Sequence, residues 1–171
     1  PHPMTPHASV IVPCYNSSAT IRPCLQSLVE QQASFPFEII AVDSSTDGTE
    51  RIIADEFPTV RLIHRDQRTM ASDARNIAVE AAACDTLCFT DSDCVAQPGW
   101  LQGMVDELHK GEARIIVGGV RPANPGARLG VASFLREFRD CNHRRHPAPT
   151  HTFLTCNLAL TREAFAAYGP F

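Results

Sequence analysis

Lysine is nearly missing from this 171-residue sequence, and no broad excess of positive charge takes its place. Lys110 is the single lysine, and the formal net charge is −4. Surfaces that bind nucleic acid carry clustered positive charge, so the composition excludes a broad nucleic-acid interface. A polyanionic ligand would have to be held by a few arginines, a helix N-terminus or a metal ion.

Long apolar runs are absent as well. The longest are strand-sized, such as 8–13 and 115–117, whereas a helix that crosses a bilayer needs about 20 apolar residues. No secretory leader is recognisable, and we expect residues 1–7 to be a tag remnant or a disordered N-terminus. These features predict a protein without a membrane span, located in the cytoplasm or peripherally at the inner face of the membrane.

Paired cysteine motifs are the third absence. The seven cysteines are odd in number, scattered, and form no C-x-x-C pair, so we expect reduced and mostly buried thiols in a cytoplasmic protein. Hydrophobic residues make up 44% and charged residues 20%, which is ordinary globular usage and argues against disorder. The length suits one domain with a sizeable core.

Four strand–helix units are predicted over residues 8–110. Short apolar runs alternate there with helical periodicity, which indicates a parallel sheet covered on both faces. Ser17 and Ser18 are candidate caps of the first helix, and Pro98 suits the first position of the fourth. The predicted strands are 9–12, 38–43, 60–63 and 86–90, and the predicted helices are 21–29, 52–57, 70–83 and 98–108.

The regular alternation of predicted strands and helices ends at residue 110. Residues 114–120 and 152–160 are predicted strands, 129–138 and 162–168 are predicted helices, and 144–149 is a polar loop broken by proline. We therefore divide the chain into a first part, 8–110, and a second part, 111–171.

Polar and aromatic side chains follow three of the predicted strands. Tyr15 comes after the first strand, Asp43 ends the second, and Asp91-Ser92-Asp93 follows the fourth. Ligands of open α/β sheets bind outside the carboxyl ends of the strands. A ring that stacks on a base, an acid that accepts its N–H, and two acids that hold Mg²⁺ or Mn²⁺ together favour a nucleotide site.

The acidic turn has two other interpretations. It could be a solvated turn with aspartates that cap the next helix. Residues 91–95 also fit the D-x-D-x-[TV] loop of haloacid-dehalogenase-like phosphatases, in which the first aspartate attacks phosphorus. That family needs a downstream lysine and an acidic pair, and it carries the loop on its first strand. This chain offers Lys110 alone and no adjacent aspartates, which disfavours the phosphatase.

Other groups also admit two interpretations. Asp47-Gly48-Thr49 is either a phosphate-binding turn or the capped start of a helix. Spacing does not decide whether Arg75 is a surface cation or a site residue. Residues 143–146, His-Arg-Arg-His, form either an anion-contacting loop or a solvated one.

Five segments, in order and with matching spacing, resemble the family-2 glycosyltransferases. The resemblance covers nearly the whole chain and implies the GT-A fold, a three-layer α/β/α sandwich with a mostly parallel central sheet. The segments are 9–16 (SVIVPCYN), 40–49 (IAVDSSTDGT), 74–78 (ARNIA), 89–94 (FTDSDC) with 98–101 (PGWL), and 155–160 (TCNLAL) with the ending 169–171 (GPF).

The resemblance implies a role for each matching residue on the donor side. Pro13 and Tyr15 would line the pocket for base and ribose, and Asp43 would accept the imide hydrogen bond of the base, usually uracil. Arg75 would lie near the nucleotide. The donor is therefore expected to be a nucleotide-diphospho-sugar, most often UDP-linked.

The resemblance also implies a metal ion and a reaction. Asp91 would approach the ribose and the metal, and Asp93 would bind Mn²⁺ or Mg²⁺ on the diphosphate directly. The metal would stabilise the departing nucleoside diphosphate as a Lewis acid. Most of the family invert the anomeric centre, with a carboxylate deprotonating the acceptor hydroxyl.

Three departures from the family pattern matter. Asp43 is followed by Ser44 where two acids often stand, and Ala78 replaces a usual glycine. The general base normally belongs to an E-D-type motif after a Gly-Gly-Phe segment, and Asp140 and Glu163 do not match it. The base is therefore expected beyond Phe171, with 111–171 as the start of an acceptor-side half.

Two functions follow as expectations. The first is an enzyme that transfers a sugar to an unknown glycan, lipid or small-molecule acceptor. The second is a non-catalytic or degenerate module that binds nucleotide-sugars. The sequence leaves a homodimer open under either function.

Overall fold

A six-stranded sheet organises the described part of the chain. The computed structural model describes residues 7–171, apart from 124–125, 127, 139–140, 142–147 and 151–153. The strand order is β3-β2-β1-β4-β6-β5. The strands are β1 (Ala8–Cys14), β2 (Phe37–Asp43), β3 (Arg61–His64), β4 (Thr86–Thr90), β5 (Ile115–Val117) and β6 (Asn157–Thr161).

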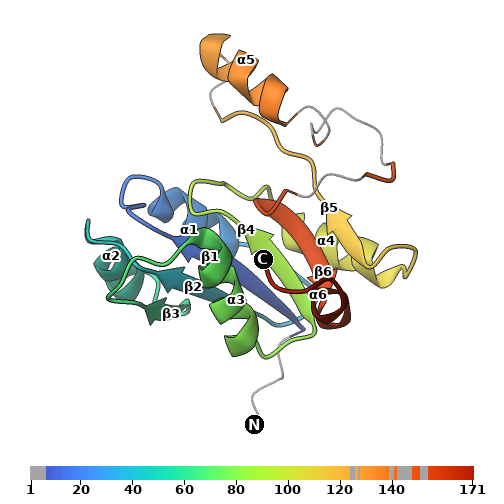
Figure 1. Ribbon diagram of the computed structural model, residues 1–171, viewed down its shortest axis with the longest axis horizontal. Helices are drawn as coiled ribbons and strands as arrows, with labels where there is room; N and C mark the ends of the chain where they lie inside the picture. The colour runs from blue at the N-terminus through green and yellow to red at the C-terminus, as the bar shows by residue number, and fades with distance from the viewer. Residues whose placement is uncertain (1–6, 124–125, 127, 139–140, 142–147, 151–153) are drawn as a thin grey trace.

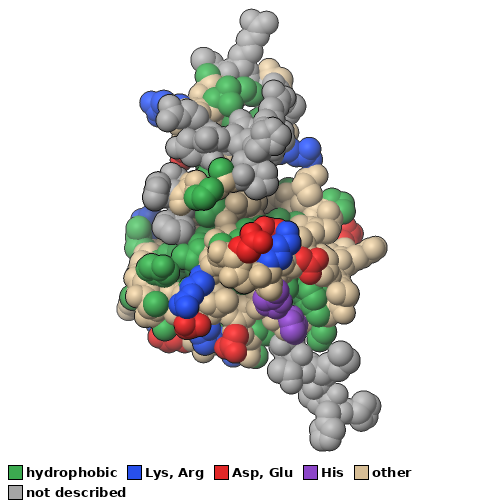
Figure 2. All heavy atoms as spheres, turned by 90° about the vertical axis from the view of Figure 1, so that its right-hand side faces the viewer, with side chains coloured by type: hydrophobic (Ala, Val, Ile, Leu, Met, Phe, Trp, Pro, Cys, Tyr) green, Lys and Arg blue, Asp and Glu red, His purple; other side chains and the backbone are tan. Residues whose placement is uncertain are grey.

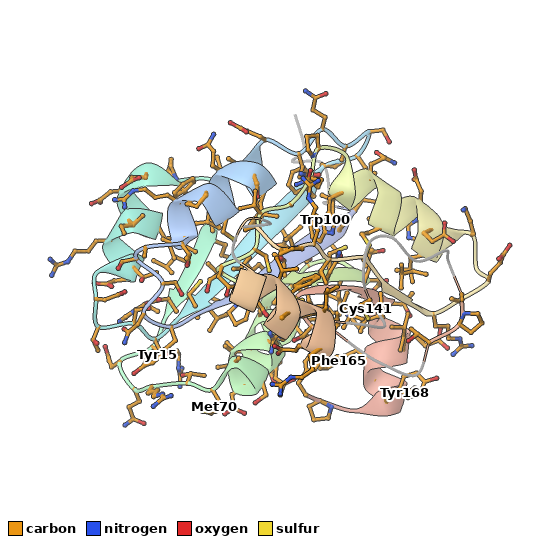
Figure 3. All side chains as sticks on the ribbon, turned by 90° about the horizontal axis from the view of Figure 1, so that it is seen from above. Tyr15, Met70, Trp100, Cys141, Phe165 and Tyr168 are labelled. Atoms are coloured by element: carbon orange, nitrogen blue, oxygen red, sulfur yellow. The ribbon has the colours of Figure 1, made fainter. Side chains whose placement is uncertain are left out.

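Helices cover both faces of this sheet (Figures 1 and 3). They are α1 (Ile21–Val29), α2 (Thr49–Glu56), α3 (Ala71–Ala81), α4 (Trp100–His109), α5 (Arg128–Glu137) and α6 (Arg162–Tyr168). The apolar stripes of α1, α2 and α4 pack on one face, and those of α3 and α6 pack on the other. Figure 1 shows α5 standing away from these layers. The predicted α/β/α sandwich is confirmed.

The sheet is mostly parallel, as expected. β1 pairs in parallel with β2 and β4, and β2 pairs in parallel with β3, while β6 runs antiparallel to both β4 and β5. A central parallel strand is covered on both faces, which is why β1 is buried along its whole length. Its polar Ser9 donates a hydrogen bond to Glu38 at 2.6 Å, so no buried hydroxyl is left without a partner there.

Successive side chains of β1 point to opposite faces of the sheet and enter two separate hydrophobic cores. Val10 and Val12 point toward α1 and α4, whereas Ile11 points toward α3. The two cores fix the sheet between its helix layers and leave the loops at the strand ends free to build a site.

The order in which the chain adds strands to the sheet reverses at β1. From β1 it proceeds outward through β2 to β3, and it then returns to place β4 on the other side of β1. The loops after β1 and β4 therefore diverge, which opens a crevice at the carboxyl ends of these two strands.

Two predicted strands are wrong in their limits. The strand predicted at 114–120 is only Ile115–Val117, and the strand predicted at 152–160 begins at Asn157, after a turn at 155–156. The Asn157 side chain donates to the carbonyl of Gly119 at 2.9 Å, and the N–H of Val120 bonds to Cys141. These hydrogen bonds take the place of further pairing between β5 and β6, so β5 ends at Val117.

The first helix begins at Ile21 as predicted, but its predicted caps and the predicted start of the fourth helix are wrong. Ser17 and Ser18 make no side-chain cap, because α1 begins at Ile21 and the Ser17 carbonyl accepts from the N–H groups of Thr20 and Ile21. Pro98 lies before α4, whose N-cap is Gly99 at φ 76°. The prediction for 143–146 and the acid Asp140 lie outside the described residues.

Charges of both signs are interspersed on the face shown in Figure 2, where acidic and basic side chains lie next to one another. The exposed pair Arg114–Glu163, at 3.0 Å, is an example. No helix among the described residues is long and apolar enough to span a membrane.

Candidate functional site

A cavity of about 230 Å³ lies at the carboxyl ends of β1 and β4 and against the start of α3. It brings together five of the six residues predicted to bind a donor and metal. Its lining residues are Pro13, Cys14, Tyr15, Thr69, Ala71, Ala74, Arg75, Asp91, Ser92 and Asp93. Asp43 is the predicted site residue that does not line it.

An ion pair forms the floor of the cavity. Arg75 donates from Nη2 to Asp91 Oδ1 at 2.5 Å, and the arginine is only 7% exposed. The spacing in the sequence left Arg75 undecided, and the structure shows that it is not a surface cation. Its Nε is buried and has no hydrogen-bond partner among the described residues.

The acidic turn is held mainly by its backbone. The carbonyl of Asp91 accepts from the Cys94 N–H at 3.0 Å and from the Cys24 thiol at 3.4 Å. The Ser92 hydroxyl bonds to the Ser17 hydroxyl at 2.7 Å. The carboxylate of Asp93 is exposed, and it accepts a weak hydrogen bond from the Cys94 thiol at 3.7 Å.

The turn fits a divalent cation that arrives together with a ligand. No group of three or more His, Cys, Asp or Glu side chains within the described residues could hold a metal by itself. Asp91 and Asp93 nevertheless present two carboxylates to one cavity. Mg²⁺ commonly binds in this way, through one or two carboxylates with phosphate and water oxygens completing its shell.

Tyr15 is the aromatic wall of the cavity. Its side chain is 40% exposed, and the Arg68 guanidinium lies over its ring with Cζ 4.6 Å from the centroid. This is the geometry of a cation–π contact. The sequence predicted Tyr15 but missed Arg68, because no local pattern indicates which residue of the β3–α3 loop will reach the ring.

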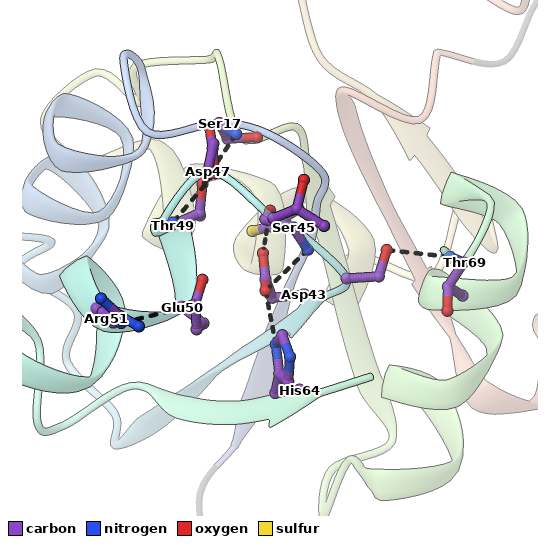
Figure 4. Close-up of polar contacts among 12 residues, drawn as sticks. Ser17, Asp43, Ser45, Asp47, Thr49, Glu50, Arg51, His64 and Thr69 are labelled. Atoms are coloured by element: carbon purple, nitrogen blue, oxygen red, sulfur yellow. Dashed lines mark hydrogen bonds and ion pairs between the residues drawn. The ribbon is translucent and has the colours of Figure 1, made fainter. Parts of the chain in front are cut away.

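Asp43 lies behind the cavity, completely buried. Its carboxylate accepts from the Ser45 hydroxyl, from the Ser45 N–H at 3.1 Å and from His64 Nδ1 at 2.9 Å (Figure 4). About four hydrogen bonds satisfy a carboxylate, so one acceptor position remains. His64 was not singled out in the sequence, although its place at the end of the neighbouring strand β3 explains the contact.

Hydrogen bonds join the β1–α1 loop to the β2–α2 loop (Figure 4). The Ser17 N–H donates to Thr49 Oγ1 at 3.0 Å, and the Ser18 N–H donates to Asp47 Oδ2 at 3.0 Å. Asp47 also accepts from the N–H and hydroxyl of Thr49. We call Ser17, Ser18, Asp47 and Thr49 the loop latch. The capped helix start is therefore the interpretation of Asp47 that the structure supports.

The loop latch changes the acidity of Asp47. The carboxylate's partial desolvation acts to raise its pKa, but hydrogen bonds from Thr49 and Ser18 outweigh this and lower the pKa to about 2. Asp47 is therefore ionised throughout the neutral range, and its oxygens are occupied by protein donors instead of facing the cavity.

None of the seven cysteines is in a disulfide, and five of them are buried. Burial raises the pKa of the Cys14 thiol well above its usual value, with nearby Cys24, Asp43 and Asp91 adding to the effect. The thiol that lines the cavity is therefore protonated and a poor nucleophile at neutral pH.

The groups that a phosphatase would need do not meet at the cavity. Lys110 is exposed at the end of α4 and pairs with Glu107. Glu163, the acid compared above with the general-base motif, pairs with Arg114 on the surface. Neither residue lines the cavity, so Asp91 has no lysine partner there.

Comparison with known proteins agrees with this geometry. The profile described as "Glycosyl transferase family 2" matches residues 9–169. The chain belongs to this family. Membership confirms the resemblance seen in the sequence and leaves the phosphatase interpretation without support.

Relatives and solved structures extend the comparison. Glycosyltransferase AglE of Haloferax volcanii is 26% identical over 97% of this chain and 56% of its own length. The mannosyltransferase PcManGT of Pyrobaculum calidifontis, solved with GDP-Man and Mn²⁺, has a TM-score of 0.72 and 27% identity over 97% of this chain and 47% of its own. Glucosyl-3-phosphoglycerate synthase of Mycobacterium tuberculosis, solved with Mn²⁺ and UDP-glucose, has a TM-score of 0.62 and 26% identity over 92% and 57%.

The chain thus spans about half the length of these relatives. The shared fold confirms the predicted GT-A arrangement.

Proposed function

We propose that the chain is the donor-binding part of a glycosyltransferase that transfers a sugar from a nucleotide-diphospho-sugar to an acceptor hydroxyl. One observation carries this proposal: Asp91 and Asp93 meet Tyr15 and Arg75 around a single cavity at the point where the strand order reverses. Relatives that share the fold are nucleotide-sugar enzymes solved with UDP-glucose or GDP-Man. The donor base and sugar remain part of the proposal, with UDP as the first choice.

Each lining residue has a proposed task. Tyr15 stacks on the base with Pro13 beside it, and the Arg75 guanidinium lies at the nucleotide. Asp43 accepts the base N–H through its remaining acceptor position. This task requires the loop after β2 to expose the carboxylate, because Asp43 is completely buried and does not line the cavity.

Asp93 and Asp91 would hold Mn²⁺ or Mg²⁺, and Asp93 would be the principal protein ligand because its carboxylate is exposed and has no ion pair with a described residue. When bound, such a cation supplies Lewis-acid stabilisation to the departing diphosphate. The Arg75–Asp91 pair orients the Asp91 carboxylate at the same cavity.

The general base is proposed to lie beyond Phe171, and the reaction is proposed to invert the anomeric centre. Asp91 and Asp93 are the acids that line the cavity within the described residues, and both are assigned to the donor and metal. This arrangement also favours the second candidate, a module that binds the donor without transferring sugar.

Calorimetric titration tests donor binding. The chain is titrated with UDP, GDP, ADP and CDP, each with Mn²⁺, with Mg²⁺ and with neither. We expect one nucleotide to bind with a clear preference, and its affinity to depend on the cation. Absence of binding for every nucleotide with both cations would overturn the proposal.

A second assay separates the enzyme from the binding module. The chain together with the natural sequence that follows Phe171 is incubated with the matching nucleotide-sugar, and release of the nucleoside diphosphate is measured. Turnover supports the transferase, whereas tight binding without turnover or hydrolysis supports the module. Seven cysteines without a disulfide support a reducing compartment such as the cytoplasm for either function.

A further inference from the structure

Asn76 connects two parts of the chain that are far apart in sequence. Its side-chain Nδ2 donates to the Phe171 carbonyl at 3.3 Å, and its Oδ1 accepts from the Phe171 N–H at 3.1 Å. A primary amide offers a donor and an acceptor in a fixed plane, which matches the backbone of a single residue. Figure 1 shows the C-terminal end lying between α3 and α6, in front of the sheet.

The backbone contact places the Phe171 ring in an aromatic cluster. The ring meets Phe89 of β4 edge-on, with centroids 5.2 Å apart, and meets Phe165 of α6 at 5.8 Å. Phe89 itself is completely buried. The ring therefore packs against Phe89 and Phe165, the Asn76 amide holds the backbone of the same residue, and Phe171 remains 39% exposed.

The same ring contacts Arg75, a lining residue of the cavity, although Phe171 itself is not a lining residue. The Arg75 guanidinium carbon lies 5.9 Å from the Phe171 centroid, within cation–π range. Arg75 donates to Asp91, while its Nε is buried without a hydrogen-bond partner. An arginine side chain has many rotamers, and few polar contacts hold this one. Packing against neighbouring side chains such as Phe171 must therefore keep Arg75 in the rotamer that reaches Asp91.

We propose that Asn76 is a positioning residue, which holds Phe171 against Arg75 and thereby fixes the Arg75–Asp91 pair for the donor nucleotide. Loss of the Asn76 amide frees the Phe171 backbone, so the ring leaves the guanidinium and water reaches it. Arg75 then samples more rotamers and donates less often in the direction of the cavity. This inference rests on the proposed function, because the donor site gives Arg75 its task.

The test compares Asn76→Ala with the unchanged protein. We expect nucleotide affinity in the presence of Mn²⁺ to fall by about tenfold, the lower end of what outer-shell partners contribute at metal sites. Gln102→Ala is the matched control, because Gln102 also accepts from a distant backbone N–H, that of Ser34 at 2.8 Å, but lies on α4. It should change the melting temperature while leaving nucleotide affinity unchanged.

Two further variants distinguish positioning from general stability. Phe171→Leu keeps the backbone bonds to Asn76 but removes the ring, and it should reproduce the loss of affinity. In an Arg75→Lys background, Asn76→Ala should change affinity by less than about twofold, since its effect passes through Arg75.

The outcomes separate this inference from the proposed function. If the unchanged protein binds no nucleotide with Mn²⁺, the proposed function fails. If it binds, but Asn76→Ala and Phe171→Leu both retain full affinity, only the positioning role is overturned. Full additivity of Asn76→Ala with Arg75→Lys would also overturn it, because independent sites add.

Discussion

Asp93 and Asp91 stand two residues apart in one turn but differ in their surroundings. Asp91 is one third exposed and paired with Arg75, whereas Asp93 is exposed and carries no ion pair within the described part of the chain. A carboxylate without a cationic partner can approach a metal without first giving up a salt bridge. The two acids of the motif therefore have separable tasks.

Asp93→Ala is expected to remove cation-dependent nucleotide binding. The loss should be at least about 100-fold, because even outer-shell partners of metal sites contribute 10–100-fold. The melting temperature should stay the same, since the side chain is exposed on a polar turn. Calorimetric titration with the nucleotide that binds best, with and without Mn²⁺, measures the change.

Asp55→Ala serves as the control for Asp93→Ala, because Asp55 is an exposed carboxylate on α2, away from the cavity. It removes the same charge and should leave binding intact. Equal nucleotide affinity in the Asp93→Ala and unchanged proteins would contradict the metal assignment.

Gly118 gives a second residue-scale prediction. A Cβ at this position would lie 2.3 Å from Asn157 Oδ1, and Asn157 is held by Trp100 Nε1 at 2.8 Å and by the Gly119 carbonyl. Gly118→Ala should therefore destabilise the protein by about 1–3 kcal/mol, as overpacking does. Chemical denaturation followed by Trp100 fluorescence measures the effect.

Gly103 offers the matched substitution. It lies inside α4, where a Cβ added to the glycine would meet no neighbouring atom within 4 Å. Gly103→Ala should stabilise the protein by about 0.5–1 kcal/mol, because alanine is the better helix former. Destabilisation of similar size in both variants would show that Asn157 does not constrain Gly118.

At the scale of elements, the loop latch predicts a dependence on acid. The pKa of Asp47 is lowered in the folded state, so its stabilising effect is complete above the ordinary aspartate pKa near 4 and is lost as pH falls toward about 2. Asp47→Asn should lower the melting temperature at pH 6, and the difference should shrink between pH 4 and about 2. Thermal melts across this range provide the measurement.

Glu112→Gln is a suitable comparison for Asp47→Asn, because Glu112 is an exposed acid beyond α4. Its melting difference from the unchanged protein should be small at every pH. A difference for Asp47→Asn that stays constant down to pH 2 would argue against ionised Asp47 as the stabilising form.

Elements and their order could be predicted from the sequence because burial imposes local patterns. The continuous apolar run of β1 and the helical spacing of Leu25 and Leu28 report burial on their own. Ligands of open α/β sheets bind at the carboxyl ends of the strands, and this predicted that Tyr15, Asp91 and Asp93 lie at one edge of the sheet. Arg75 joined them through the family resemblance and not through spacing.

The contacts that hold these residues could not be predicted. Ser17 and Ser18 look like helix caps, yet their N–H groups bond to Thr49 and Asp47, about thirty positions away. His64 on Asp43, Arg68 on Tyr15 and Asn76 on Phe171 likewise depend on which loops meet in space. Local sequence carries no signal for such pairs, because a polar residue in a loop has many equivalent partners before folding.

At the scale of the whole molecule, the two halves expected from the sequence share one sheet. β6, from the second half, pairs with β4 along Thr86–Thr90, and β5 pairs with β6. Leu158 and Leu160 pack in the same core as Leu87 and Phe89. The second half thus completes the sheet on which the first half builds its site.

Truncation after Lys110 tests whether residues 8–110 form an independent unit. We expect the shortened chain to aggregate or to melt without cooperativity, because β4 would expose an unpaired edge and the buried Phe89. Size-exclusion chromatography and thermal melting measure this. A monomeric fragment that melts cooperatively and binds nucleotide would instead establish an autonomous donor-binding domain.

The loop latch has a consequence for how such a protein can change over generations. Thr49 serves Ser17 and Asp47 at once, and Ser17 in turn reaches Ser92 of the acidic turn. A substitution that removes the Thr49 hydroxyl leaves the Ser17 N–H without its acceptor, so a second substitution must supply a new one. Substitutions in these loops should therefore occur in pairs among related sequences. This should hold even at positions that do not contact a ligand.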